Sequence, residues 1–113
     1  MKVSFDALLA QLPRAATATW PAGEPFVRAL AHGSMSVEAF APNELDRQSP
    51  HAQDELYFIQ RGSGRLTIND VVHDCTAGDA FFVAAGEPHR FTEFTHDFAT
   101  WVVFWGPQGG ELP

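Results

Sequence analysis

Two residue types that bind metal ions lie close together in the stretch SPHAQDELYFIQRGSG, residues 49–64. They are the imidazole of His51 and the carboxylate of Glu55, both common ligands of transition metals. On an extended strand His51, Gln53 and Glu55 project to one face, because side chains alternate with a period of two. A straight strand separates the two potential ligands by about 13 Å, so they can share an ion only where the chain bends or bulges. From this stretch alone, an ordinary surface or core histidine is the simpler interpretation.

A second imidazole follows in the stretch AGDAFFVAAGEPHRFTE, residues 77–93. A Gly-Asp turn, an apolar strand and a glycine- and proline-containing turn precede His89 in this stretch. His89 therefore offers a second imidazole, in addition to that of His51, which the first stretch lacks.

Together the two stretches resemble the motif pair of the cupin superfamily. The first motif of that family reads glycine, five residues, His-any-His, three or four residues, Glu, six residues, Gly. The second reads Gly, five residues, Pro-any-Gly, two residues, His, three residues, Asn. The residues in register are His51, Glu55 and Gly62 for the first motif and Gly78, Gly86 and His89 for the second.

Four motif positions differ from the family pattern. Ser49 stands where the first histidine is expected, and Asn43 stands at the initial glycine. Ala84 replaces the motif proline, and Glu93 replaces the motif asparagine. The two motifs span about half of the chain, so the resemblance is specific for the fold and less specific for a metal.

The resemblance implies an all-β, cupin-type double-stranded β-helix, a small jelly-roll barrel with one short N-terminal helix and a ligand site inside one mouth. It implies that His51, Glu55 and His89 bind a divalent metal ion, which could be Fe, Zn, Mn, Ni or Co. Ser49 is a poor ligand, so one family position is missing. Gln53 has the parity to reach inward and to bind the ion directly or through water.

Other polar residues have open roles. Tyr57 shares the inward parity of Glu55, so it is either a core aromatic with a satisfied hydroxyl or a cavity group. Glu55 and Tyr57 are the candidate catalytic residues. Asp54 has the opposite parity and is expected to face outward or to cap a turn. We expect Arg90 and Glu93 to form a surface ion pair.

The elements that must position these groups are mostly short strands. Apolar spacing and the N-cap residue Ser4 predict a helix over residues 5–12 that Pro13 ends. Period-two or β-rich runs separated by turn residues then predict strands at 26–32, 34–41, 55–60, 64–69, 71–75, 80–84, 89–94 and 99–105. We expect one domain over 1–113, with a helix and loop (1–25), a barrel (26–105) and a tail (106–113). Phe81, Phe82, Phe91 and Trp101 are expected in the core or the cavity wall.

The last predicted strand is apolar on both faces. Val102 and Phe104 lie on one face, and Trp101, Val103 and Trp105 lie on the other. A strand of a sandwich normally has one solvated face. Because a short helix cannot cover a whole sheet, a second copy of the chain is the expected cover, and a homodimer is predicted.

Composition limits the class of protein and its partners. The chain has 113 residues, a net charge of −7 and one cysteine, Cys75. An acidic chain repels phosphate backbones, so nucleic acid is not an expected partner. No apolar run is long enough to span a membrane and no signal peptide is evident, so a cytoplasmic location is expected. Cys75 cannot form an intramolecular disulfide and is expected to be buried.

Three functions fit these features. The first is an enzyme that uses a metal ion on a small organic molecule, as dioxygenases, isomerases and decarboxylases of the superfamily do. The second is a non-catalytic module that binds a small molecule with or without a metal. The third is a metal-free isomerase or epimerase in which His89 or Tyr57 transfers protons.

Overall fold

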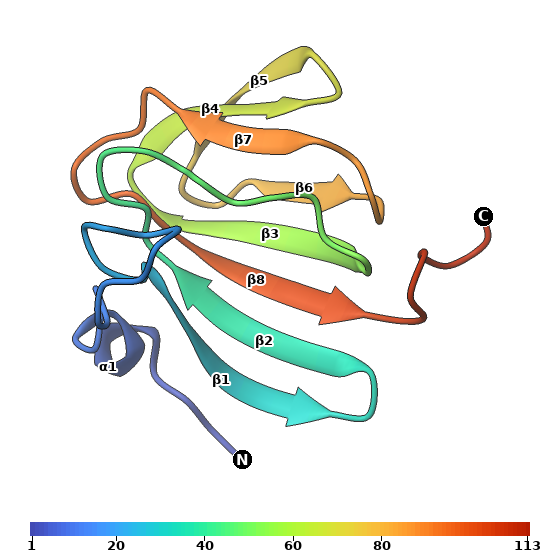
Figure 1. Ribbon diagram of the computed structural model, residues 1–113, viewed down its shortest axis with the longest axis horizontal. Helices are drawn as coiled ribbons and strands as arrows, with labels where there is room; N and C mark the ends of the chain where they lie inside the picture. The colour runs from blue at the N-terminus through green and yellow to red at the C-terminus, as the bar shows by residue number, and fades with distance from the viewer.

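A computed structural model describes all residues from 1 to 113 (Figure 1). It contains one short helix and eight strands, as the sequence predicts. The elements are α1 Phe5–Leu9, β1 Phe26–His32, β2 Met35–Phe40, β3 Asp54–Arg61, β4 Ser63–Ile68, β5 Val71–Thr76, β6 Ala80–Val83, β7 His89–Thr92 and β8 Ala99–Trp105. Each of the eight predicted strands is present, with ends that differ by no more than two residues.

The strands form two antiparallel sheets that lie one above the other (Figure 1). One sheet has the order β1-β2-β8-β3-β6 and the other the order β5-β4-β7. Neighbouring strands are often distant in the sequence, because β8 inserts between β2 and β3. This arrangement confirms the predicted all-β jelly roll.

Helix α1 ends earlier than the predicted helix over residues 5–12. Ser4 is the N-cap, as expected, and its hydroxyl accepts a hydrogen bond from the first turn. After the helix, the N–H groups of Gln11 and Leu12 donate to carbonyls three residues back, at 3.0 Å each. Pro13 cannot continue a helix and disfavours helical geometry in the residue before it, so the last turn tightens instead of extending.

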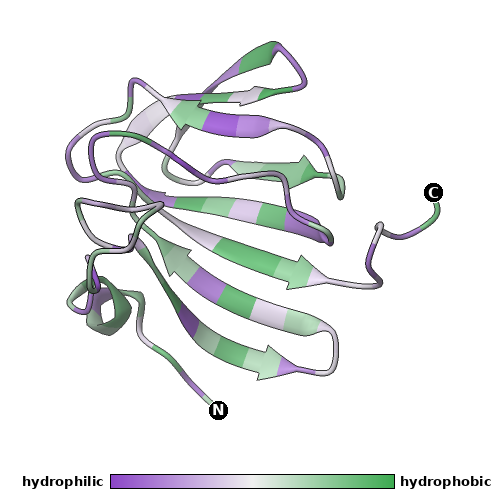
Figure 2. Cartoon of the chain, in the orientation of Figure 1, coloured by the Kyte–Doolittle hydropathy of each residue, from purple (hydrophilic) through white to green (hydrophobic).

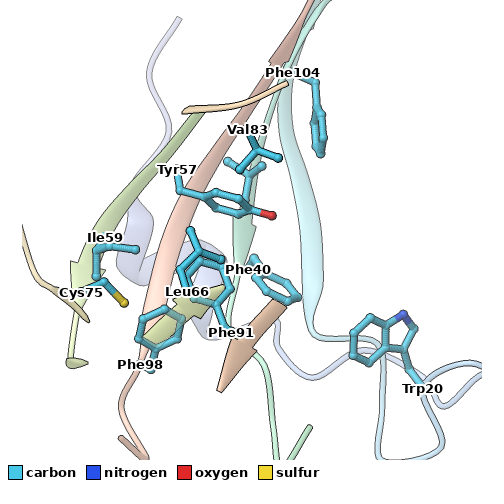
Figure 3. Packing of buried hydrophobic residues seen from close by; sticks show 11 residues of the cluster. Trp20, Phe40, Tyr57, Ile59, Leu66, Cys75, Val83, Phe91, Phe98 and Phe104 are labelled. Atoms are coloured by element: carbon cyan, nitrogen blue, oxygen red, sulfur yellow. The ribbon is translucent and has the colours of Figure 1, made fainter. Parts of the chain in front are cut away.

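The main core lies between the two sheets and is rich in aromatic rings (Figure 3). Phe91 of β7 is at its centre, with ring centroids 4.9 Å from Phe98 and 5.0 Å from Tyr57. Cys75 is also buried there, as predicted. Rings packed tilted or edge-on stabilise a core beyond the area that they bury. This core fixes the position of Tyr57, whose hydroxyl points away from its own strand (Figure 3).

A second cluster covers part of the outer face of the five-stranded sheet. Phe5 and Leu8 of α1 pack on Ala39 and Ala99, and the ring of Phe5 lies 4.8 Å from that of Trp101. Strand β8 is hydrophobic along most of its length (Figure 2). The helix therefore covers one end of the face and leaves the rest open.

No helix of the structure is long and apolar enough to pass through a bilayer.

Gly62 joins β3 to β4 in a conformation that only glycine adopts without strain. Its φ is 74°, and a Cβ there would come within 2.3 Å of the Thr95 hydroxyl and 2.9 Å of the Cα of Phe98. Gly78 also has a positive φ, 99°, but a Cβ there would meet no atom within 4 Å. Gly62, the last residue of the first motif, is thus required by both conformation and space. Gly78, which opens the second motif, is required by conformation alone.

Gly62→Ala should therefore destabilise the protein more than Gly78→Ala. The left-handed conformation costs an alanine about 1 kcal/mol at either site. At Gly62 the clash with the segment before β8 should raise the loss to about 3 kcal/mol. Denaturant unfolding of both variants measures the difference in their free energies of unfolding. Equal decreases in this free energy would show that the close approach at Gly62 has no energetic consequence.

Candidate metal centre

The structure brings His51, Glu55 and His89 together. Each offers one ligand atom, and these atoms lie within 4.8 Å of one another. Glu55 faces inward near the start of β3, opposite Val83 and Phe104 of the neighbouring strands. His89 is the first residue of β7, on the facing sheet. The site therefore joins the two sheets.

His51 reaches this site because the chain bends before β3 begins. Residues 51–53 are not part of the strand, so the separation expected for a straight chain does not apply. The carbonyl of His51 accepts a hydrogen bond from Gly86 N–H at 2.8 Å, and that of Ala52 accepts one from Gly109 N–H at 2.7 Å. These bonds hold the bend against the loop that precedes His89 and against the C-terminal segment.

His89 is oriented by its backbone neighbour. Its Nδ1 lies 2.9 Å from the carbonyl oxygen of Glu87, so Nδ1–H donates there. Its Nε2 lies 2.9 Å from Oε1 of Glu55 and 3.0 Å from the Tyr57 hydroxyl. Burial lowers the pKa of His89, but the hydrogen bond and charge of Glu55 outweigh it, so the pKa is raised overall. Nε2 is thus the nitrogen presented to the site, and either a proton or a cation there neutralises Glu55.

Glu55 has an unmatched oxygen. Its side chain is 1% exposed, and Oε2 has no hydrogen-bond partner. A buried carboxylate oxygen without a donor or a cation is costly, by about 1–3 kcal/mol or more for a charged group. The donor set fits a divalent cation, because such an ion would satisfy this oxygen between two imidazoles.

His51 is half-buried at the edge of the cavity. Burial lowers its pKa, Glu55 opposes this effect, and His89 adds to it. The imidazole is therefore neutral at neutral pH, the form in which histidine binds metal ions. Its Nε2 lies 3.1 Å from Oε1 of Gln48, and its ring packs 4.8 Å from that of Phe104.

Gln48 and Asp46 are site residues that sequence reasoning missed. The side-chain oxygen Oε1 of Gln48 lies 3.0 Å from the Tyr57 hydroxyl, which donates to it, and also contacts His51. Asp46 accepts hydrogen bonds from the Gln48 backbone at 3.1 Å, from its side-chain amide at 2.6 Å, and from Phe91 N–H at 2.9 Å. Asp46 thus fixes Gln48. Their segment is irregular, so strand parity gives no signal there; the Asx-turn tendency of Asp46 was the one local indication.

Tyr57 belongs to both the core and the site, so the two interpretations of it, as a core aromatic and as a cavity group, are both partly right. Its ring packs in the core, while its hydroxyl contacts His89 and Gln48. Burial, followed by the charge of Glu55, raises the pKa of Tyr57 well above its ordinary value. The phenol therefore stays neutral and can donate a hydrogen bond at neutral pH.

Gln53 lines the cavity beside the cluster, and its amide nitrogen is engaged elsewhere. Its amide nitrogen donates to the carbonyls of Ser34 at 3.0 Å and Gly106 at 2.9 Å. We therefore leave Gln53 out of the ligand set proposed below. Ser49 is exposed and lines the cavity beside the site.

Some expectations for residues outside the site are wrong. Phe82 is 54% exposed instead of buried, because it neighbours inward-facing Phe81 on a strand and must point to the opposite face. Glu93 forms its ion pair with Arg65, at 2.8 Å, and not with Arg90. The reason is that β4 pairs with β7 and brings Arg65 opposite Thr92.

Asp54 takes the role of a loop cap, one of the two roles expected for it. It lies on the face of β3 opposite to Glu55 and is buried. Its carboxylate accepts hydrogen bonds from Glu111 N–H at 2.8 Å and from Ala85 N–H at 2.9 Å. These two bonds lower the pKa of Asp54. They connect the C-terminal segment to the loop before His89.

A cavity of about 400 Å³ opens beside the cluster. Its wall includes His51 and Tyr57, and the rest is a mixture of aromatic, charged, uncharged polar and small apolar residues. A pocket of this size and composition suits a small organic molecule.

Comparison with known proteins gives consistent results. Residues 36–105 match the family model described as "Cupin domain". The uncharacterized protein SCO3923 of Streptomyces coelicolor is 33% identical over 85 residues, which cover 74% of this chain and 81% of that protein.

Solved structures share the fold at low identity. A cupin 2 conserved barrel domain protein from Salinispora arenicola has a TM-score of 0.61 at 18% identity, covering 72% of this chain and 74% of that one. The DMSP lyase DddQ from Ruegeria pomeroyi has a TM-score of 0.60 at 20% identity, covering 74% of this chain and 48% of that one. At such identities the likeness concerns the fold alone.

Asp46→Ala should destabilise the protein by about 2–3 kcal/mol, because it leaves the Phe91 N–H and the Gln48 amide without their acceptor. Asp74→Ala is the matched control, since Asp74 is 93% exposed and its ion pair with Arg65 is 3.5 Å long. The control should change the free energy of unfolding by less than about 0.5 kcal/mol. A similar loss of unfolding free energy in both variants would mean that the hydrogen bonds of Asp46 do not hold the segment around Gln48.

Proposed function

The chain belongs to the cupin domain family, and from that premise we propose that it binds a divalent transition-metal ion through His51, Glu55 and His89. We propose further that the adjoining cavity holds a small organic molecule, on which the metal centre acts. When bound, the ion supplies Lewis-acid polarisation of a ligand oxygen or activation of water or dioxygen.

The observation that carries this proposal is the buried, unpartnered Oε2 of Glu55. A protein that used Glu55 only as a partner of His89 would need one carboxylate oxygen, and the structure supplies that contact through Oε1. The second oxygen has no role without a cation or a proton. Two imidazoles and one carboxylate suit Fe, Zn, Mn, Ni or Co and do not suit the oxygen-preferring Ca²⁺ and Mg²⁺.

The residues around the cluster have separable tasks. Glu87 holds the ring of His89 through Nδ1, so Nε2 is presented for coordination. Gln48, held by Asp46, orients the ring of His51 through Nε2, which leaves Nδ1 of His51 for coordination. Tyr57 keeps its proton and can donate it toward a bound molecule, and Glu55 is the nearby base. These are the roles that we propose for the two candidate catalytic residues.

Metal content tests the proposal directly. Protein purified without added metal and analysed by mass spectrometry of elements should contain about one ion per chain or take it up stoichiometrically. His51→Ala, His89→Ala and Glu55→Gln should each lose most of this metal. His73→Ala is the matched control, because His73 lies beside Phe81 on the edge of the other sheet and outside the cluster.

Unchanged metal content in the three site variants would contradict the proposal, as would a wild-type protein that neither contains nor takes up a divalent ion. Circular dichroism of each variant separates loss of a ligand from loss of the fold.

We also propose that two copies of the chain associate through the outer face of the five-stranded sheet. An apolar row crosses all five strands there, one residue per strand in direct register. Its members, called the outer row below, are Leu30, Val37, Val103, Leu56 and Phe82. Phe58 on the same face is 43% exposed and Phe82 is 54% exposed. The helix covers only the far end of this face, and a continuous apolar row of this kind indicates an interface.

Light scattering tests the dimer. The wild-type protein should have about twice the 12.4 kDa mass of one chain, and Val103→Glu should shift it to the single-chain mass, because a charge buried at the centre of the outer row opposes association. Val72→Glu is the control, since Val72 is 58% exposed on the other sheet. A wild-type mass of one chain would contradict the proposal.

A further inference from the structure

The charges in the cavity wall show what kind of molecule the site would select. Two of the seven basic residues of this acidic chain, Arg28 and Arg47, line the cavity. Neither forms an ion pair, whereas Arg61 pairs with Asp6 and Arg65 pairs with Asp74 and Glu93. Two unpaired guanidinium groups at one cavity provide a local positive field in a chain of net charge −7.

The two arginines come from different elements, β1 and the segment between β2 and β3. Arg28 lies on β1 with Phe26, and both share the inward face with Glu38 and Phe40 of β2. A bulge directly after Arg28 moves Leu30 to the outer face of the sheet, so β1 serves both the cavity and the outer row. Arg47 lies on the loop between Asp46 and Gln48, whose hydrogen bonds fix that segment.

Glu38 is the one acidic side chain in the cavity wall, and it does not neutralise Arg28. It stands opposite Arg28 in the register, yet no ion pair joins them. Burial raises the pKa of Glu38, the charge of Arg28 opposes this rise, and Glu55 and Glu24 add to it. Burial thus disfavours the charged form of Glu38, and the guanidinium of Arg28 is left without an ion pair.

The cavity wall also contains aromatic side chains among smaller polar and apolar residues. Trp20, Phe26 and Phe40 line the cavity, with Trp20 packed edge-on at 6.4 Å from Phe26 and 6.3 Å from Phe40. His51 and Tyr57 lie in the same cavity wall and belong to the metal centre. The cavity thus combines cationic groups, flat apolar surface and the candidate metal centre.

We propose that the ligand of this cavity is a small organic carboxylate with an apolar or ring-shaped body, whose carboxylate is bound by Arg28 and Arg47. This inference rests on the proposed small-molecule function of the site. A guanidinium binds a carboxylate through two parallel hydrogen bonds, and the aromatic wall accommodates the organic body. A monoanion fits better than a doubly charged phosphate, because the buried carboxylate of Glu55 in the adjoining cluster opposes additional negative charge.

Calorimetric titration with three matched probes tests this inference. Benzoate carries the carboxylate, benzamide is its neutral counterpart, and phenyl phosphate carries the alternative anion. Benzoate should bind and benzamide should not bind at the same concentrations. Arg28→Gln and Arg47→Gln should each weaken benzoate binding by about tenfold, the effect expected for one lost charged hydrogen bond.

Arg90→Gln is the matched control, because Arg90 is exposed on β7 and outside the cavity wall. It should leave benzoate binding unchanged. If an arginine variant fails to fold, the salt dependence of benzoate binding to the wild type replaces it: affinity should fall as ionic strength rises.

Equal binding of benzoate and benzamide, no benzoate binding at all, or full affinity in both arginine variants would overturn the inference. Tighter binding of phenyl phosphate than of benzoate would overturn the assignment to a carboxylate. Each titration is run on both chelator-treated and metal-loaded protein. Arginine-dependent benzoate binding by a protein that takes up no metal would refute the proposed metal centre and leave the carboxylate ligand standing. Metal uptake by a protein that does not bind benzoate would refute the carboxylate ligand and leave the metal centre standing.

Discussion

The site depends on one constraint, a carboxylate buried between two sheets with only half of its hydrogen-bonding capacity used. Glu55 contacts His89 through Oε1, and its Oε2 has no partner. Burying an ionised carboxylate is costly unless a positive charge accompanies it. His51 and His89 can offset this cost by holding a cation or a proton, because both place ring nitrogens near the carboxylate.

The fold supplies rigid supports for this arrangement. Glu55 lies on β3 between β6 and β8, so its backbone is fixed on both sides. His89 begins β7 on the opposite sheet, with its ring held by Glu87. The aromatic core around Phe91 sets the distance between the sheets, and the Phe91 N–H also donates to Asp46, which in turn holds Gln48. Packing, loop geometry and ligand orientation are therefore connected through a few hydrogen bonds.

Much of this could be predicted from the sequence, and the limits have physical causes. Period-two patterns and turn residues located the eight strands, and the spacing of His51, Glu55 and His89 identified the three groups that converge. The sequence could not reveal Gln48 or Asp46, because they lie in an irregular segment whose side-chain directions follow from tertiary hydrogen bonds. Gln53 shows the same limit: it lines the cavity, but its amide donates to the carbonyls of Ser34 and Gly106, contacts that spacing along the chain does not contain. The partner of Glu93 depended on which strands pair, and short-range spacing does not contain that information.

The most direct test of the metal centre is a crystal structure of protein purified without chelators, with anomalous scattering recorded at the absorption edge of the metal. We predict one peak bonded at about 2.0–2.2 Å to a nitrogen of each histidine and to a carboxylate oxygen of Glu55. In that structure the Nε2 of His89 would bond to the ion, and the proton it shares with Glu55 would be absent. A map without such a peak after addition of divalent metal, with Nε2 of His89 still 2.9 Å from Oε1 of Glu55, would contradict the account.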